Sequence, residues 1–142
     1  MRTALDSSVV ILLQRQQAGW KEWRETLTVA AGEGPLLISS VAFAECTTGY
    51  SSLELALERF AALQIRYDPL APDAAYLAGQ TFLRYRRSGG PRTHLIPDFL
   101  IAAHAQVQAD RLAALDRGYF RPYFGELRLL QPAPGGQAGP AT

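Results

Sequence analysis

Short apolar runs alternate along this chain with longer segments in which apolar residues recur every three or four positions. A strand repeats every two residues and a helix every ~3.6, so the short runs indicate buried strands and the longer segments indicate helices. Strands are expected at 3–5, 36–38, 64–67, 111–115 and 127–130. Helices are expected at 9–13, after a cap at Ser7 or Ser8, and at 18–30, 52–63, 72–87 and 97–108, with one more that follows Ser39 or Ser40 and carries Glu45. This alternation predicts an α/β layered fold with a mainly parallel sheet.

The composition is that of one globular domain. With 142 residues, 48% of them hydrophobic, the chain is long enough to bury one core. We expect this domain at 1–130 and a mobile tail at 131–142, where Pro, Gly and Ala dominate. One cysteine excludes an internal disulfide, and neither an export segment nor an apolar run of about 18 residues is present. A soluble, cytoplasmic protein is expected.

The basic residues are unusual in kind, although the formal net charge is only +1. All of the 14 basic residues except Lys21 are arginines, which favour bidentate contacts with phosphate or carboxylate. Four of them form a cluster just ahead of Asp98. This arginine cluster is either a basic lip beside an acidic site or a solvated charged face. Its members are Arg84, Arg86, Arg87 and Arg92.

Four acidic residues adjoin or interrupt apolar runs, where a carboxylate is hardest to keep ionised. They are Asp6, Glu45, Asp98 and Asp116. Ligands of open parallel sheets bind beyond the carboxyl ends of the strands. Asp6 and Asp116 directly follow expected strands, Asp98 follows Pro97 at a helix start, and Glu45 is about one and a half turns into its helix. All four are therefore expected to point into one cleft.

A bound cation would make such a gathering of acids stable. Two like charges ~4 Å apart repel by roughly 4 kcal/mol at an effective dielectric of 20, and a divalent ion removes that penalty. Carboxylate oxygens suit Mg²⁺ or Mn²⁺. Zinc would recruit His or Cys, and His94, His104 and Cys46 lie at unrelated positions. The sequence therefore favours a magnesium or manganese site.

Each acid also has a purely structural interpretation. Asp6 competes with Ser7 and Ser8 to cap the first helix. Asp98 suits the positive end of a helix dipole, and Asp116 suits a turn. This interpretation is weakest for Glu45, because a carboxylate inside an apolar helix face gains no stability from that position alone. Among the other acids, Asp68 adjoins a proline and is expected to be solvated or capping.

Two further features concern packing. Trp20, Trp23 and Leu27 share one helix face, which is either core or a contact for a partner. His104 lies six residues beyond Asp98, about 240° round the helix, and is expected to point away from the cleft.

Four segments of this chain, taken in order, resemble a known family. They are LDSSVV at 5–10, Ala44-Glu45 after Ile38-Ser39-Ser40, IPDFLIAAHA at 96–105 and LDRGYF at 115–120. Together they resemble PIN-domain ribonucleases, and most closely the VapC-like toxins of bacterial type II toxin–antitoxin systems. The resemblance spans roughly residues 5–130. It departs from the family at Ser8, where Asn is frequent, and near Ala114, where Ser or Thr is frequent.

This resemblance implies a three-layer α/β/α sandwich and a metal-dependent endoribonuclease. It implies a Mg²⁺ or Mn²⁺ site made by Asp6, Glu45, Asp98 and Asp116, with RNA as substrate, inhibition by a cognate antitoxin, and a toxin homodimer. We assign Asp6 and Asp98 to direct metal ligation, and Glu45 to ligation or to orientation of the attacking water. Asp116 is assigned to support of that site or to a second ion.

Two other functions are compatible with the pattern. A non-catalytic PIN-like module would keep the fold and bind a protein or RNA. A Mg²⁺-dependent phosphoaspartyl enzyme would also place Asp6 at a strand end, but it would require a lysine near the phosphate, and Lys21 lies in an amphipathic helix. Metal-dependent cleavage of RNA distinguishes the ribonuclease from both.

Overall fold

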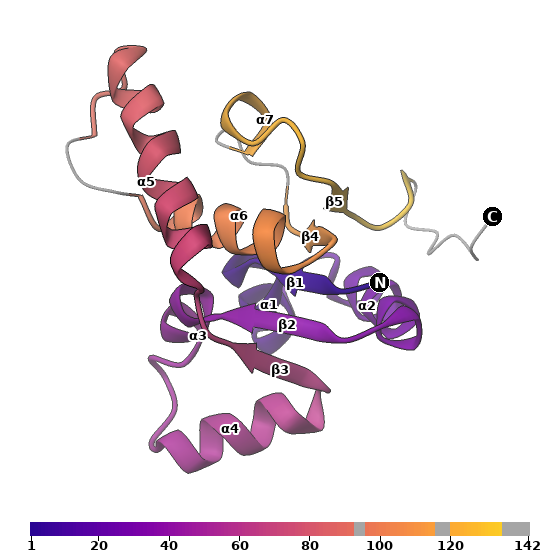
Figure 1. The fold of residues 1–142 in the computed structure, drawn as a ribbon. Coiled ribbons are helices and arrows are strands. Elements are labelled where there is room, and N and C mark those ends of the chain that lie inside the picture. Colours follow the sequence, from indigo (N-terminus) through magenta and orange to yellow (C-terminus); the bar gives the residue numbers. More distant parts are fainter. Residues whose placement is uncertain (93–95, 116–119, 135–142) are drawn as a thin grey trace.

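A computed structural model describes residues 1–92, 96–115 and 120–134, and Figure 1 shows the chain. Twelve elements lie within these ranges. They are β1 (Thr3–Leu5), α1 (Ser7–Gln14), α2 (Trp20–Glu33), β2 (Leu36–Ser39), α3 (Ser40–Cys46), α4 (Leu53–Ala62), β3 (Ile65–Asp68), α5 (Pro72–Arg87), α6 (Pro97–Gln108), β4 (Arg111–Ala113), α7 (Phe120–Tyr123) and β5 (Leu129–Leu130).

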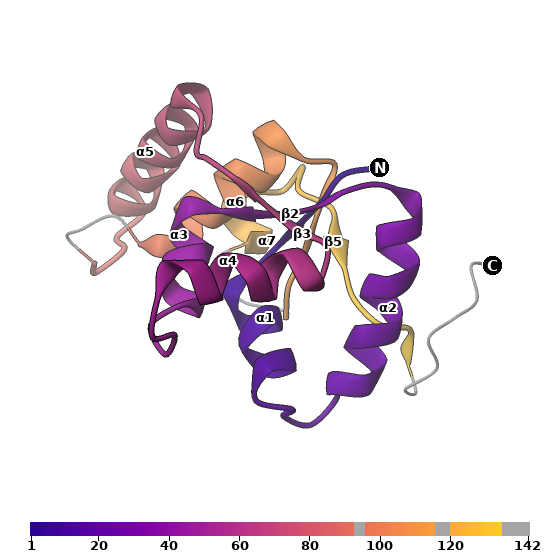
Figure 2. The same cartoon turned by 90° about the horizontal axis from the view of Figure 1, so that it is seen from below.

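The strands form one sheet in the order β3-β2-β1-β4-β5, and every described pair is parallel. Parallel neighbours need crossover connections, which the helices supply. Figure 2 shows α1 and α2 on one side of the sheet and α5 and α6 on the other. The predicted three-layer α/β/α sandwich is therefore confirmed. Helix α4 lies outside the layers, beside the edge strand β3 (Figure 1).

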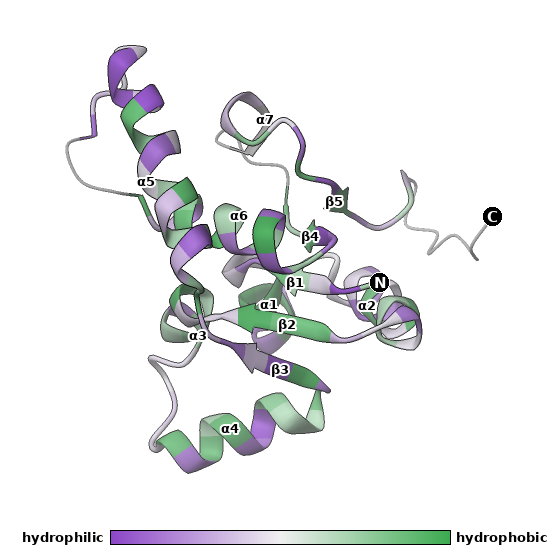
Figure 3. Ribbon diagram, viewed as in Figure 1, coloured by the Kyte–Doolittle hydropathy of each residue, from purple (hydrophilic) through white to green (hydrophobic). Residues whose placement is uncertain are grey.

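The core is built from the central strands and the helices that cover them. All residues of β1 and β2 are buried, as expected for strands covered on both faces. Figure 3 shows strongly hydrophobic residues in β2 at the centre of the sheet. Leu5, Ile38, Leu112 and Phe99 are each at most 1% exposed. Each described helix is too short or too polar to serve as a bilayer span.

Most predicted elements agree with the structure to within a few residues, and the differences lie at their ends. Asp6, rather than Ser7 or Ser8, caps α1, because both serines are already inside the helix. Ser39 caps α3 and Ser52 caps α4 through their side-chain oxygens. The short helix α7 was not predicted.

The two tryptophans of α2 differ in burial. Trp23 and Leu27 are buried in the core, at 4% and 5% exposure. Trp20 is only partly buried, and the cationic groups of Lys21 and Arg24 lie 5.7 Å and 5.1 Å from its ring centroid. The predicted shared face is therefore mainly core.

Candidate metal centre

The carboxyl ends of the central strands bring Asp6 to one edge of the sheet. Asp6 directly follows β1, whose neighbour β4 is in register with it, Leu5 facing Ala113. The backbone N–H of Asp6 donates to the carbonyl of Ala113 at 2.9 Å. This position is where ligands of parallel α/β sheets bind.

The carboxylate of Asp6 is buried and only half satisfied. Its residue is 1% exposed, and its Oδ2 accepts hydrogen bonds from the Ser8 N–H at 3.2 Å and from the Ser8 hydroxyl. Its Oδ1 is buried and makes no hydrogen bond within the part of the chain that the structure describes. A buried anionic oxygen without a partner is costly unless a cation or a proton compensates it. The Asp6 site therefore fits a cation.

Glu45 is joined to the same edge by Ser7. The Ser7 hydroxyl donates to Oε1 of Glu45 at 2.8 Å, across 38 positions of sequence. Ser7 begins α1 directly after Asp6, so this bond links the start of α1 to α3. Glu45 itself is exposed, and its second oxygen is available to solvent or to an ion.

Cys46, the residue after Glu45, is near enough to both acids to be affected by their charges. Burial raises the pKa of the Cys46 thiol to about 12, with smaller contributions in the same direction from the negative charges of Glu45 and Asp6. The thiol lies 3.8 Å from the Ser7 carbonyl oxygen. Cys46 is thus a buried, protonated thiol.

Asp98 lies in the first turn of α6, directly after Pro97, as predicted. The residue is half-buried, and the N-cap residue Ile96 provides no side-chain hydrogen bond to the helix start. Helix α6 packs against β1 and α3, the elements that lead to Asp6 and that carry Glu45. Its next residue, Phe99, is fully buried and anchors this turn to the core.

The fourth acid, Asp116, lies outside the described residues. Within the described ranges, no three acidic, histidine or cysteine side chains lie close enough together to hold a metal ion. The structure therefore brings Asp6 and Glu45 to one edge and places Asp98 on a helix packed against it. Convergence of all four acids stays a prediction.

Among the described residues, His104 is paired elsewhere and the Cys46 thiol is buried and protonated, which leaves oxygen donors at this edge. His104 is fully buried, and its Nε2 lies 2.8 Å from Oδ2 of Asp68. The Gln108 amide donates to the same oxygen at 3.1 Å. The prediction that Asp68 is merely solvated or capping was wrong, because burial of His104 required an acceptor at the end of β3. A donor set of carboxylates suits Mg²⁺ or Mn²⁺ rather than zinc.

A large groove lies away from the acids and was not predicted. It encloses about 880 Å³ between α4, strands β2 and β3 and the end of α2. A second hollow of about 340 Å³ adjoins it and shares the lining residues Ala31, Gly32, Leu36, Gln64 and Ile65. Leu57 lines the groove and is 45% exposed. An apolar groove of this kind is typical of a surface that another chain covers.

The fold and the buried aspartate define a class of α/β/α proteins with a carboxylate site at the carboxyl edge of a parallel sheet. The sequence profile of the PIN domain matches residues 3–125, and the chain belongs to this family. The chain is similar to Ribonuclease VapC10 of Mycobacterium tuberculosis. The two are 36% identical over 131 residues, which cover 92% of this chain and 94% of that protein.

Solved structures with the same fold are toxin–antitoxin complexes. VapBC2 from Rickettsia felis, bound to a DNA fragment from its promoter, gives a TM-score of 0.69 at 18% identity and covers 91% of this chain and 97% of its own. VapBC-1 from nontypeable Haemophilus influenzae gives 0.67 at 17% identity, covering 91% and 96%. A toxin–antitoxin complex from Klebsiella pneumoniae gives 0.62 at 19% identity, covering 92% and 98%. At these identities the likeness concerns the fold.

Proposed function

We propose that this chain is a metal-dependent endoribonuclease and the toxin of a toxin–antitoxin pair. The observation that carries the proposal is the buried Asp6 carboxylate, whose Oδ1 has no partner among the described residues and which Ser7 connects to Glu45. Membership of the PIN-domain family and the similarity to a protein named a ribonuclease support the substrate class.

The acids would divide the work of holding a Mg²⁺ or Mn²⁺ ion. Asp6 and Asp98 would ligate it, Glu45 would ligate it or orient the attacking water, and Asp116 would support them or hold a second ion. A divalent ion so held lowers the pKa of a bound water and neutralises charge on the phosphate. Ser7 and Ser8 would fix the carboxylates of Glu45 and Asp6 through the hydrogen bonds described above.

The phosphoaspartyl alternative finds little support in the structure. Such a site requires a cation near the phosphate, whereas the Lys21 ammonium lies over the ring of Trp20 on α2. Helix α2 covers one face of the sheet. Along the chain, all of α1 and the turn that follows it separate Lys21 from Asp6. The ribonuclease therefore remains the better interpretation.

An antitoxin is the proposed protein partner, and the groove beside α4 is its proposed site. The related solved structures are complexes of a toxin with its antitoxin. The apolar groove in this chain offers room for a segment that folds on binding. A cytoplasmic location and a homodimer of the toxin belong to the same proposal.

The proposal is tested by incubating purified, partner-free protein with RNA in Mg²⁺ or Mn²⁺, and again in excess chelator. We expect cleavage with either metal and none with chelator, because carboxylates alone do not activate water. Cleavage that continues undiminished in chelator would rule out the metal mechanism. A protein that binds RNA yet never cuts it would instead be the non-catalytic module.

A further inference from the structure

The arginine cluster is a basic surface without acidic neighbours in sequence. Residues 74–97 contain no Asp or Glu, whereas all four cluster arginines lie within them. The four side chains are exposed on the last turns of α5 and on the turn that follows. None of them takes part in an ion pair among the described residues. Figure 3 shows the outer end of α5 as strongly hydrophilic.

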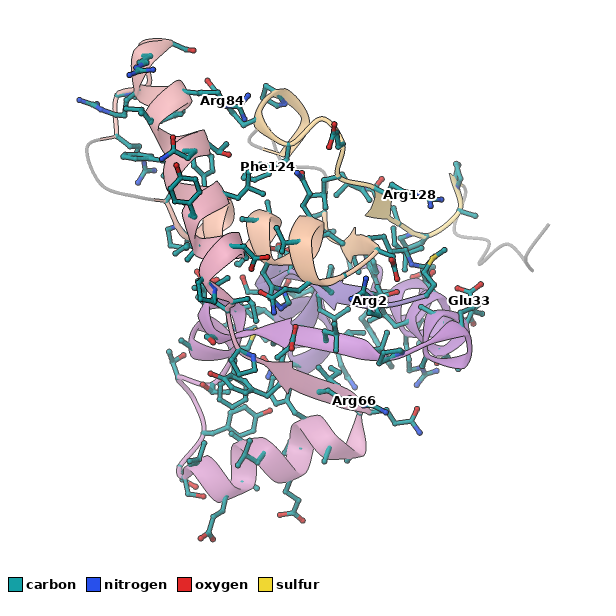
Figure 4. The ribbon with its side chains drawn as sticks, viewed as in Figure 1. Arg2, Glu33, Arg66, Arg84, Phe124 and Arg128 are labelled. Atoms are coloured by element: carbon teal, nitrogen blue, oxygen red, sulfur yellow. The ribbon has the colours of Figure 1, made fainter. Side chains whose placement is uncertain are left out.

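Two of the arginines donate hydrogen bonds to backbone carbonyls and so stabilise this surface. Nη1 of Arg86 donates to the carbonyl oxygens of Gly90 and Arg92, both at 2.9 Å. Nη2 of Arg84 donates to the carbonyl of Tyr123 at 3.1 Å, and Figure 4 shows Arg84 between α5 and α7. These bonds fix the turn after α5 and tie the end of α5 to α7.

The turn after α5 packs on the ring of Tyr85 at Gly90. A Cβ on Gly90 would lie 2.4 Å from the Tyr85 ring, so only glycine allows this close packing. The Tyr85 hydroxyl also accepts a hydrogen bond from the Arg92 N–H at 3.3 Å. The turn is therefore packed against a buried aromatic ring.

The side chains of the other two arginines have no polar partner among the described residues. The guanidinium groups of Arg87 and Arg92 make no hydrogen bond or ion pair there, and both are exposed. The negative end of the helix dipole explains a cation at Arg87, at the end of α5. It does not account for Arg92, which lies beyond the helix.

This surface is held in a fixed relation to Asp98. The Tyr85 ring packs edge-to-face on Phe99, with 5.5 Å between centroids, and Phe99 is the residue after Asp98. Arg92 precedes Asp98 by six residues, so their backbones are at most ~22 Å apart at ~3.3–3.6 Å per residue. A nucleic-acid strand that passed the acids could therefore reach Arg92 within several nucleotides.

We propose that Arg87 and Arg92 bind phosphates of single-stranded RNA that flank the bond to be cut. This inference rests on the proposed ribonuclease function. The guanidinium group of arginine can donate two parallel hydrogen bonds to the oxygens of one phosphate. Such phosphate contacts position a strand without recognising its bases. A protein partner is the less suitable occupant because the apolar groove lies beside α4, far from the outer end of α5 in Figure 1.

The test compares two double variants that remove the same charge. Arg87→Gln with Arg92→Gln removes the proposed contacts, and Arg59→Gln with Arg128→Gln removes two exposed arginines, one on α4 and one just before β5. Binding of a labelled single-stranded RNA is measured in excess chelator at several salt concentrations. For the first variant we expect the slope of log affinity against log salt to fall by roughly 1.4, at ~0.7 for each lost phosphate contact. For the second we expect the wild-type slope.

Cleavage in Mg²⁺ gives a second readout. The Arg87 and Arg92 double variant should raise KM for a long RNA. It should cut a dinucleotide, which has no phosphate beyond the bond to be cut, at the wild-type rate. Equal salt slopes in the two double variants would overturn the proposal, and so would a loss of antitoxin affinity without a loss of RNA affinity. If wild type cuts RNA while the slopes are equal, only this surface is wrong. If wild type neither binds nor cuts RNA, the proposed function fails with it.

Discussion

The Ser7 hydroxyl donates a 2.8 Å hydrogen bond to Oε1 of Glu45 and so joins the residue after Asp6 to the last turn of α3. Glu45 is exposed, and an exposed carboxylate on a helix normally samples several rotamers. The serine restricts it to one of them. The metal centre that we propose therefore depends on a neutral hydroxyl as well as on its acids.

Removing that hydroxyl should weaken the site more than the fold. For Ser7→Ala we expect metal affinity and the cleavage rate to fall roughly 10–100-fold, the usual effect of losing a group that orients a ligand. The free energy of unfolding should change by no more than about 0.5 kcal/mol, because Glu45 is solvated. Metal titration and chemical denaturation measure the two quantities. Ser51→Ala, at an exposed serine, is the control, and equal metal affinities in the two variants would contradict the assigned role of Ser7.

Neutralising Asp98 should separate catalysis from stability. Asp98→Asn should abolish cleavage but leave the metal-free protein as stable as wild type or more so, because it relieves repulsion among the acids. The loss of a favourable helix-dipole contact opposes this gain by about 0.3–1 kcal/mol. Thermal unfolding in chelator gives the stability. Destabilisation well beyond that range would mean that Asp98 is chiefly a structural residue of α6.

Asp68 should be more important for stability than its half-exposed position suggests. Asp68→Ala leaves the buried His104 imidazole without the acceptor at 2.8 Å, and an unsatisfied buried polar group costs about 1–3 kcal/mol. Asp73→Ala, in the exposed first turn of α5, should cost less, about 0.3–1 kcal/mol. Urea denaturation at neutral pH compares them. Equal losses would show that the His104 contact contributes little.

The groove beside α4 should bind the antitoxin. Leu57→Lys places a charge in the groove, so antitoxin affinity should fall at least tenfold, equivalent to about 1.4 kcal/mol. Leu53→Lys is the matched control, since Leu53 is on the same helix, is 65% exposed and does not line the groove. RNA cleavage by either free variant should equal wild type. Unchanged antitoxin affinity in Leu57→Lys would place the partner elsewhere.

Sequence patterns predicted the sheet well because the strands are buried on both faces and read as short apolar runs. β1 was predicted at its observed bounds, and β2 and β3 within one residue. β4 was predicted two residues too long, since Ala114 and Leu115 are apolar but lie beyond the last pair with β5. Helix α7 was missed because four residues with a proline among them carry no periodic signal.

Sequence patterns singled out the candidate acids but not the contacts that support them. Asp6 and Asp98 stand out because each borders an apolar run. The bond from Ser7 to Glu45 and that from Asp68 to His104 each join residues more than 35 positions apart. Such pairs arise from the packing of α3 and α6 on the sheet, which local patterns do not encode. The groove was missed for the same reason, since its lining comes from α2, β2, α4 and β3.

Binding of Mn²⁺ to the metal-free protein, followed by electron paramagnetic resonance, tests the central claim most directly. We expect saturable binding to wild type and its loss in each of four variants: Asp6→Asn, Glu45→Gln, Asp98→Asn and Asp116→Asn. Asp73→Asn, which removes an exposed carboxylate from the start of α5, should bind Mn²⁺ like wild type. Wild-type affinity in any of the four would show that this acid does not belong to the site, and undiminished binding in all four would contradict the metal centre altogether.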